Sequence, residues 1–272
     1  MAKPALKAAL LSPQRPLGGH PLLVVGPSLG TSSILWNRAA SVLGADYDVV
    51  AWDLPGHGVS PAASEGFDVA DLADAVVDLI DSIAPGSPFH YAGVSLGGAV
   101  GLQLGIKNGE RLKSLSVQNS GARIGTPEAW LERAETVRTQ GTPVMIQGSA
   151  ERWFAPGFMD SQPELSSRLL HALRDADRFS YAFCCEALAA FDVRAQLGSI
   201  SVPTQVVAGA LDGVATPAMA EEVAAGIRDG GGTATAVTVE GISHLAPAEA
   251  PGHVADLMRS LVGWAESRAA AQ

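Results

Sequence analysis

Ser95 has the setting of a serine nucleophile. It lies in the pentapeptide GVSLG (Gly93–Gly97), at the end of a strand-like run, His90–Val94, and just before a helical pattern, Gly98–Asn108. A serine at such a strand–turn–helix junction is typical of a nucleophile elbow, in which small neighbours let the backbone turn sharply and raise the hydroxyl above the sheet. We therefore predict covalent acyl chemistry at Ser95. The alternative is a glycine-rich turn with an incidental serine.

A serine nucleophile needs a general base, and two of the six histidines follow strand-like runs. His244 follows the last such run, whereas His57 lies in a sharp turn, Asp53–Gly58. The loops at the carboxyl ends of parallel strands meet at one edge of a sheet, where ligands bind. His244 completes the chain order serine, acid, histidine, so we predict that it is the base. We interpret His57 as a turn residue with a structural hydrogen bond.

Asp212 is the predicted partner of the histidine. It follows the run Gln205–Ala208 and lies between Ser95 and His244 in the chain. The other loop in which an acid could stand, Gln118–Ser120, contains no carboxylate. A carboxylate that orients the imidazole and stabilises its positive charge completes a catalytic triad. A solvated turn aspartate is the alternative.

Two backbone amides are predicted to bind the oxyanion that forms during acyl transfer. The residue after the nucleophile, Leu96, supplies one amide in this kind of site, and the loop after Leu22–Val25 supplies the other. Pro27 in that loop has no N–H to donate, so we assign the second donor to Leu29.

These residues need a sheet that brings distant loops together, and the apolar pattern predicts one. Apolar runs rich in β-branched residues alternate with helical patterns, which is typical of a parallel sheet buried on both faces. The predicted strands are Leu22–Val25, Val49–Trp52, His90–Val94, Leu115–Val117, Gln205–Ala208 and Ala236–Val239, with Ala5–Leu11 as an antiparallel edge strand turned by Gly18 and Gly19. The predicted helices are Leu35–Leu43, Val69–Ile83, Gly98–Asn108, Pro217–Ile227 and Pro251–Ser267.

The alternation stops between about residues 125 and 197, where helical patterns follow one another. They cover Pro127–Gln140, Pro143–Trp153, Pro163–Asp175 and Asp177–Ala190. Long insertions of this kind are usually functional, and this one is expected to cover the ligand crevice of the sheet. We therefore predict an α/β fold whose core comprises residues 1–124 and 198–272. Residues 125–197 would form an inserted helical cap that is not an independent domain.

Composition excludes several other functions. The 272 residues carry a formal net charge of −10, which disfavours nucleic acid and anionic membrane surfaces as partners. The adjacent Cys184 and Cys185 predict core packing rather than a disulfide framework, and no Cys/His spacing resembles a zinc site. The early apolar run Ala8–Leu11 is too short for a signal peptide, so we expect a cytoplasmic protein. The sequence leaves a homo-oligomer open.

Several segments resemble the α/β-hydrolase fold and, over nearly the whole chain, the family of bacterial 3-oxoadipate enol-lactonases. The cap segments are the more specific part of this resemblance, because many esterases share the triad motifs. The similar segments are Ser28–Thr31 with Trp36, Asp53–Gly58, Arg123–Thr126 with Trp130 and Arg133, Glu151–Phe154, and Tyr181 with Cys184 and Cys185. The chain departs from the family at Pro27, Phe183 and Phe191, which bear on how a substrate fits.

The resemblance implies hydrolysis of a five-membered enol lactone with a carboxymethyl arm to 3-oxoadipate, with no cofactor or metal. A general carboxylesterase, a carbon–carbon bond hydrolase and a cofactor-free haloperoxidase are alternatives within the fold. A dehalogenase is disfavoured because its nucleophile is an aspartate, and Ser95 occupies that place. A non-catalytic ligand receptor on the same scaffold is the alternative from another class.

An acidic protein that binds a small anionic lactone needs a local cation, preferably an arginine. In the helical pattern Pro127–Gln140, Trp130 lies on the apolar face, and Arg133 and Arg138 lie at the edges of that face. We predict that Arg133, backed by Trp130, meets the substrate carboxylate, with Arg138 and Trp153 as further substrate-binding candidates. The alternative is that both arginines pair on the solvent side with Glu128, Glu132 or Glu135.

Overall fold

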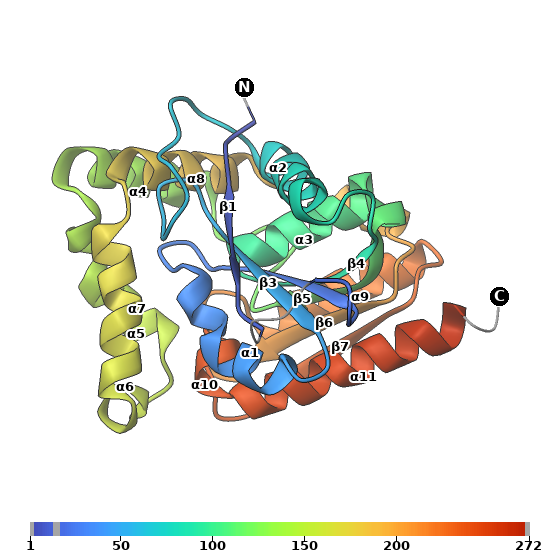
Figure 1. The fold of residues 1–272 in the computed structure, drawn as a ribbon. Coiled ribbons are helices and arrows are strands. Elements are labelled where there is room, and N and C mark those ends of the chain that lie inside the picture. The colour runs from blue at the N-terminus through green and yellow to red at the C-terminus, as the bar shows by residue number, and fades with distance from the viewer. Residues whose placement is uncertain (1–2, 13–16, 270–272) are drawn as a thin grey trace.

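A mostly parallel β-sheet forms the centre of the protein (Figure 1). The computed structural model describes residues 3–12 and 17–269, and within them seven strands follow the spatial order β1-β3-β2-β4-β5-β6-β7. Only β1 runs antiparallel to its neighbour. The strands are β1 (Lys7–Leu10), β2 (Leu22–Gly26), β3 (Asp48–Asp53), β4 (Phe89–Val94), β5 (Leu112–Gln118), β6 (Thr204–Gly209) and β7 (Ala234–Val239).

Helices cover both faces of this sheet. Helix α1 packs against α11 on one face, and α2 packs against α3 on the other (Figure 1). These core helices are α1 (Asn37–Leu43), α2 (Val69–Ile83), α3 (Leu96–Lys107), α9 (Pro217–Asp229), α10 (Ala246–Glu249) and α11 (Pro251–Ala269), with 3₁₀ turns η1 (Ser33–Trp36), η2 (Gly109–Arg111) and η4 (Arg194–Ser199). Strands β3, β4 and β6 are buried along their whole length, which explains their continuous apolar runs.

Helix α2 illustrates how local sequence fixes an element. The Asp68 carboxylate accepts a hydrogen bond from the Asp71 amide, and the Asp71 carboxylate accepts one from the Asp68 amide, which forms a capping box. Leu72, Val76 and Ile80 recur every four residues and are fully buried. The cap fixes where the helix begins, and the apolar stripe fixes which face meets the core.

The structure confirms the predicted α/β fold, with changed bounds at some elements. The edge strand β1 is shorter than the predicted Ala5–Leu11. The predicted helix Leu35–Leu43 begins as a 3₁₀ turn and becomes α-helical only at Asn37. The indole of Trp36 donates a hydrogen bond to the carbonyl of Gly26, 2.9 Å away, so this turn is tied to the end of β2.

Between β5 and β6 the chain is mainly helical. Apart from η4, which continues to Ser199, the helices lie within the segment 125–197 that the sequence predicts as a cap. These helices are α4 (Pro127–Gln140), η3 (Thr142–Met145), α5 (Ile146–Trp153), α6 (Phe158–Ser161), α7 (Pro163–Asp175) and α8 (Arg178–Ala190). Thr126 caps α4 and Asp177 caps α8 through side-chain hydrogen bonds to the backbone. Helices α4 and α8 pack side by side beyond the edge of the sheet (Figure 1).

The turn from β4 into α3 holds Ser95 in a strained conformation, with φ 56° and ψ −114°. Two glycines follow close behind Ser95 because the backbone is crowded there. A Cβ atom added at Gly97 would lie 2.7 Å from the carbonyl oxygen of Pro27, and one at Gly98 would lie 2.5 Å from the Cβ of Ser120. Glycine at both positions is therefore a packing requirement of the turn.

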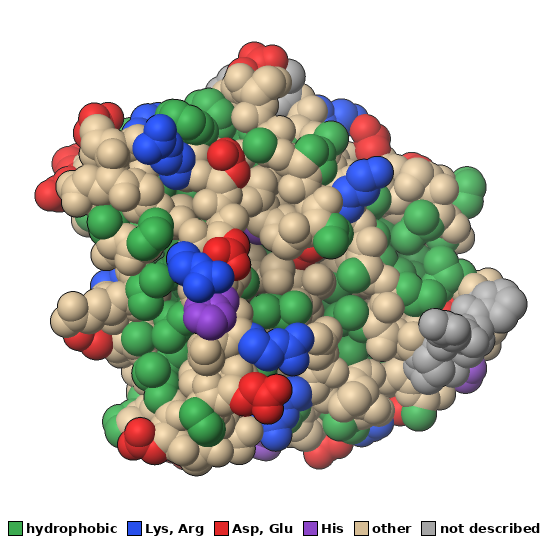
Figure 2. Space-filling model, turned by 60° about the vertical axis from the view of Figure 1, so that its left-hand side comes forward, with side chains coloured by type: hydrophobic (Ala, Val, Ile, Leu, Met, Phe, Trp, Pro, Cys, Tyr) green, Lys and Arg blue, Asp and Glu red, His purple; other side chains and the backbone are tan. Residues whose placement is uncertain are grey.

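The face of the molecule that includes the cap carries positive, negative and apolar side chains in a mixture (Figure 2). None of the helices in the described ranges combines the length and apolar character that crossing a bilayer requires. The described residues also contain no cluster of three or more His, Cys, Asp or Glu side chains that could hold a metal ion.

We predict that Gly97→Ala lowers the free energy of unfolding by roughly 1–3 kcal/mol, because the new methyl group would meet backbone that cannot move aside. Gly263→Ala is the matched control: Gly263 lies exposed within α11, with no atom near its added Cβ, so alanine should stabilise the protein by about 1 kcal/mol. Urea unfolding measures both changes. Equal effects of the two substitutions would contradict the packing argument.

Candidate active site

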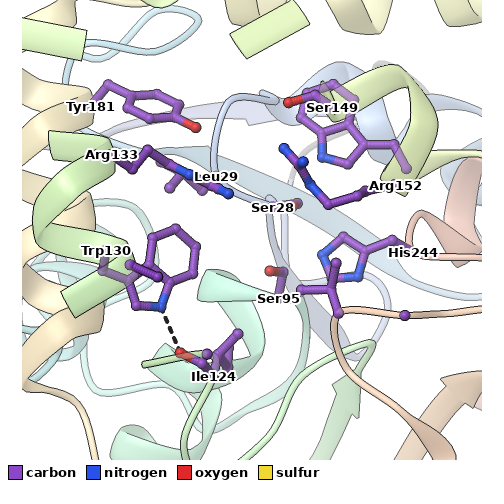
Figure 3. Close-up of a pocket in the computed structure, with 15 residues that line it drawn as sticks. Ser28, Leu29, Ser95, Ile124, Trp130, Arg133, Ser149, Arg152, Tyr181 and His244 are labelled. Atoms are coloured by element: carbon purple, nitrogen blue, oxygen red, sulfur yellow. Dashed lines mark hydrogen bonds between the residues drawn. The ribbon is translucent and has the colours of Figure 1, made fainter. Parts of the chain in front are cut away.

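Three loops bring Ser95, Asp212 and His244 to the carboxyl edge of the sheet. Ser95 follows β4, Asp212 follows β6 and His244 follows β7. The Nδ1 atom of His244 lies 2.8 Å from Oδ2 of Asp212, and Ser95 and His244 line the same cavity (Figure 3). All three side chains are almost fully buried. The structure thus brings together the three residues that the sequence selects.

Asp212 is held by four hydrogen-bond donors. The amides of Val214 and Ala215 donate to Oδ1, and Asn119 Nδ2 and His244 Nδ1 lie within 3.0 Å of Oδ2. Burial raises the pKa of Asp212, but the hydrogen bond and charge of His244, together with the Ala215 and Asn119 bonds, outweigh it and lower that pKa below its ordinary value. An ionised Asp212 accepts a hydrogen bond from the Nδ1–H group of His244, which leaves Nε2 of His244 as an acceptor for the serine proton.

Asn119 belongs to the site, although sequence reasoning dismissed its loop for lacking a carboxylate. Its Nδ2 donates to Asp212 Oδ2 at 3.0 Å and to the carbonyl of Ser243 at 2.9 Å. Its φ of 46° is in the left-handed region, which asparagine tolerates better than most residues. The next residue, Ser120, donates its hydroxyl proton to the carbonyl of Ser95 at 2.7 Å. The position directly after β5 was the available signal for both residues.

The predicted oxyanion donors come from two different segments of the chain. Leu29 lines the cavity, and the amide of Leu96 begins helix α3 directly after the nucleophile. Within the described part of the chain, neither amide donates a hydrogen bond to another protein group. The loop of Leu29 is fixed by the Gly97 amide, which donates to the Pro27 carbonyl at 3.0 Å.

The cavity above Ser95 has a volume of about 210 Å³ and is walled by cap helices α4, α5 and α8 (Figure 3). Trp130, Arg133 and Trp153 line it, as the sequence predicts for substrate-binding residues. Among the lining residues that were not selected from the sequence are three polar cap residues, namely Ser149, Arg152 and Tyr181. Arg152 and Tyr181 lie in the cap segments that carry the resemblance to enol-lactonases, which was the available signal.

Two arginines in the cavity wall have no acidic partner. The Arg133 guanidinium lies over the Trp130 ring, 4.6 Å from its centroid. Burial lowers the pKa of the Arg152 guanidinium, and the nearby charge of Arg133 lowers it further. Among the described residues, no carboxylate lies within ion-pair distance of either arginine. Guanidinium groups are the side chains best suited to pair with carboxylates and phosphates.

Arg138 does not line the cavity, so the prediction that it binds the substrate is wrong. Its guanidinium lies 2.6 Å from Glu186 on α8 and 5.4 Å from the centre of the Phe183 ring. Arg138 is more than one helical turn beyond Arg133, so it meets α8 instead of the cavity. The alternative partners on α4 itself, Glu128, Glu132 and Glu135, form no ion pair with Arg133 or Arg138.

His57 lies outside the cavity. Its buried ring places Nδ1 2.8 Å from the carbonyl of Pro55 and stacks on Tyr181, with 6.0 Å between ring centroids. Burial lowers the pKa of His57 below its ordinary value. These contacts agree with the structural interpretation of His57. Cys184 and Cys185 are also buried, and burial raises the pKa of both thiols, which disfavours thiolate chemistry.

The fold and the site define the class of protein. The chain matches the alpha/beta hydrolase family over residues 22–257 and belongs to that family. It is 40% identical over 200 residues to 3-oxoadipate enol-lactonase 2 of Acinetobacter baylyi, an alignment that covers 73% of this chain and 74% of the relative. It is 36% identical over 196 residues to 3-oxoadipate enol-lactonase 1 of the same organism, covering 72% and 73%.

A solved enol-lactonase structure is also similar to this protein. The enol-lactonase from Burkholderia xenovorans LB400 superposes with a TM-score of 0.88 at 28% identity, covering 95% of this chain and 96% of that chain. The protein is therefore a carboxylic-ester hydrolase that resembles the enol-lactonases, as the sequence motifs predict.

We predict that Asn119→Gly lowers kcat about 10-fold and leaves KM unchanged. Glycine keeps the left-handed backbone but removes the donor to Asp212, and a hydrogen bond to a charged group is worth about 1.5 kcal/mol. Asn119 does not line the cavity, so substrate binding should be preserved. Steady-state kinetics test this, with Asn108→Gly at the far end of α3 as the control. A higher KM with normal kcat would contradict the assigned role.

The lowered pKa of Asp212 predicts a pH-dependent effect on stability. Because the folded-state pKa lies below the ordinary value of 3.8, ionised Asp212 stabilises the fold above that value, and this contribution is lost as the pH falls through the folded pKa. We expect the difference in free energy of unfolding between the wild type and Asp212→Asn to be largest near neutral pH and to shrink below about pH 4. Urea unfolding at several pH values measures it. A difference that stays constant with pH would contradict the prediction.

Proposed function

We propose that the protein opens the ring of 3-oxoadipate enol lactone and releases 3-oxoadipate, through an acyl-enzyme on Ser95. The observation that carries this proposal is the pair Arg133 and Arg152, two guanidiniums without acidic partners in the wall of the cavity that contains Ser95. A neutral ester would leave both positive charges unpaired, whereas the carboxylate arm of the lactone would pair with them. The likeness to two enol-lactonases supports the same substrate.

In the first half of the reaction, Ser95 Oγ attacks the lactone carbonyl carbon and His244 Nε2 takes the serine proton. Asp212 stabilises the resulting imidazolium. The amides of Leu29 and Leu96 bind the tetrahedral oxyanion, where a single donor of this kind is worth about 10²–10³ in rate. The intermediate collapses by breaking the bond between the carbonyl carbon and the ring oxygen.

The leaving oxygen is an enolate, which departs more readily than an alkoxide and stays tethered to the acyl chain. It takes a proton from His244 and tautomerises to the ketone. In the second half, His244 removes a proton from water as the water attacks the ester on Ser95, and the tetrahedral intermediate expels the serine oxygen, which regains its proton. The balance needs only water, so the proposed reaction requires no cofactor or metal.

A general carboxylesterase is the alternative within the family, and a non-catalytic receptor is the alternative outside it. The apolar ring faces of Trp130 and Trp153 could hold many acyl groups, but they leave the two arginines unexplained. A receptor would not need a strained serine and a histidine in the wall of one cavity.

Replacing either cavity arginine should weaken binding of the anionic substrate selectively. We predict that Arg133→Ala and Arg152→Ala each raise KM for the enol lactone by about 10-fold or more, with little change in KM for a neutral p-nitrophenyl ester, because a charge-assisted bond is worth about 1.5–3 kcal/mol. Arg138→Ala, which removes a cap arginine outside the cavity, should leave both KM values unchanged. Equal increases in KM for the two substrates would reject an anion-binding role.

A serine-directed fluorophosphonate probe should label the wild type and not Ser95→Ala, as read by intact-protein mass spectrometry. A wild type that remains unlabelled would favour the receptor. Labelling of both proteins would place the nucleophile elsewhere.

A further inference from the structure

Glu249 accepts hydrogen bonds from both neighbours of His244 and from the cap. Its Oε1 accepts from the amide of Ser243 at 3.0 Å and from the amide of Leu245 at 3.3 Å. Its Oε2 accepts from the amide of Ala155, 2.7 Å away, at the end of helix α5. One carboxylate therefore joins two segments that lie far apart in the sequence.

Two more hydrogen bonds run along the same contact. The hydroxyl of Ser243 donates to the carbonyl of Arg152 at 3.1 Å, and the amide of His244 donates to the carbonyl of Trp153 at 3.2 Å. Arg152 and Trp153 both line the cavity. The segment that presents these side chains to a ligand is thus fixed against the loop that presents the imidazole.

The carboxylate of Glu249 is partly buried, which makes the hydrogen bonds that it accepts important. Burial raises the pKa of Glu249 above its ordinary value, while the three amides and the charge of His244 act in the opposite direction. A partly buried carboxylate needs donors, and bonds from amides to an ionised acceptor are stronger than neutral ones. Glu249 does not line the cavity, so it does not touch a ligand there.

We propose that Glu249 is a positioning residue that holds His244 and the cavity wall formed by Arg152 and Trp153 in one fixed arrangement. This inference rests on the proposed role of His244 as the general base. The geometry requires a carboxylate, because both oxygens accept hydrogen bonds. Glutamine at this position would turn one acceptor into an NH₂ group that faces an amide donor.

The test compares Glu249→Gln and Glu249→Ala with the wild type on the enol lactone and on a neutral p-nitrophenyl ester. We expect kcat to fall about 10- to 100-fold on both substrates, because a misplacement of about 1 Å can cost 10²-fold. The rate of fluorophosphonate labelling should fall in parallel. KM should rise for the enol lactone alone, since only that substrate needs Arg152.

Asp68→Asn is the matched control. Asp68 also accepts a backbone hydrogen bond, but it caps α2 far from the site, so its replacement should lower the unfolding midpoint and leave kcat, KM and labelling unchanged. A double variant, Glu249→Gln with Arg152→Ala, should have a KM for the enol lactone no higher than that of Arg152→Ala alone, because both changes act through one side chain.

An unchanged kcat in folded Glu249→Gln would overturn the proposal, and so would equal increases in KM for the two substrates. Unfolding curves establish that the variants are folded, and the isosteric glutamine variant provides the test if the alanine variant does not fold. A wild type that hydrolyses only the neutral ester would refute the proposed substrate. The kcat and labelling comparisons would still test Glu249 in that case.

Discussion

The strained backbone of Ser95 is the constraint on which the site depends. Its φ of 56° is maintained by a crowded junction, in which Gly97 lies against the Pro27 carbonyl and the Tyr91 hydroxyl donates to the Gly97 carbonyl at 2.8 Å. The same contacts fix the loop that carries Leu29. The nucleophile and the predicted oxyanion donors are therefore positioned by one set of contacts.

The charge of the cavity wall is opposite in sign to the net charge of the protein. The protein carries a net charge of −10, yet the cavity wall contains two arginines that no acidic side chain of the described residues neutralises. Burial lowers the pKa of Arg152 and the like charge of Arg133 lowers it further, so holding the two guanidiniums close together costs free energy. An anionic ligand would relieve that cost on binding. Under the proposed function, this unfavourable arrangement in the free protein is the basis of selectivity for an anionic substrate.

Residues whose positions follow from the order of the strands can be predicted from the sequence. Ser95, Asp212 and His244 each follow a recognisable strand, and parallel strands bring such loops to one edge, so their meeting was predictable. Arg138 was wrongly selected because helical periodicity does not reveal that α8 packs beside α4. Arg152 could not be selected by spacing alone. Its place in the cavity depends on how the cap lies over the sheet.

The central claim is that these distant side chains form one acyl-transfer centre, and a crystal structure of the fluorophosphonate adduct tests it most directly. The account predicts a phosphorus atom bonded to Ser95 Oγ, with its phosphoryl oxygen within hydrogen-bond distance of the amides of Leu29 and Leu96 and with His244 Nε2 beside the serine oxygen. An adduct on another residue, or a phosphoryl oxygen directed away from both amides, would contradict it.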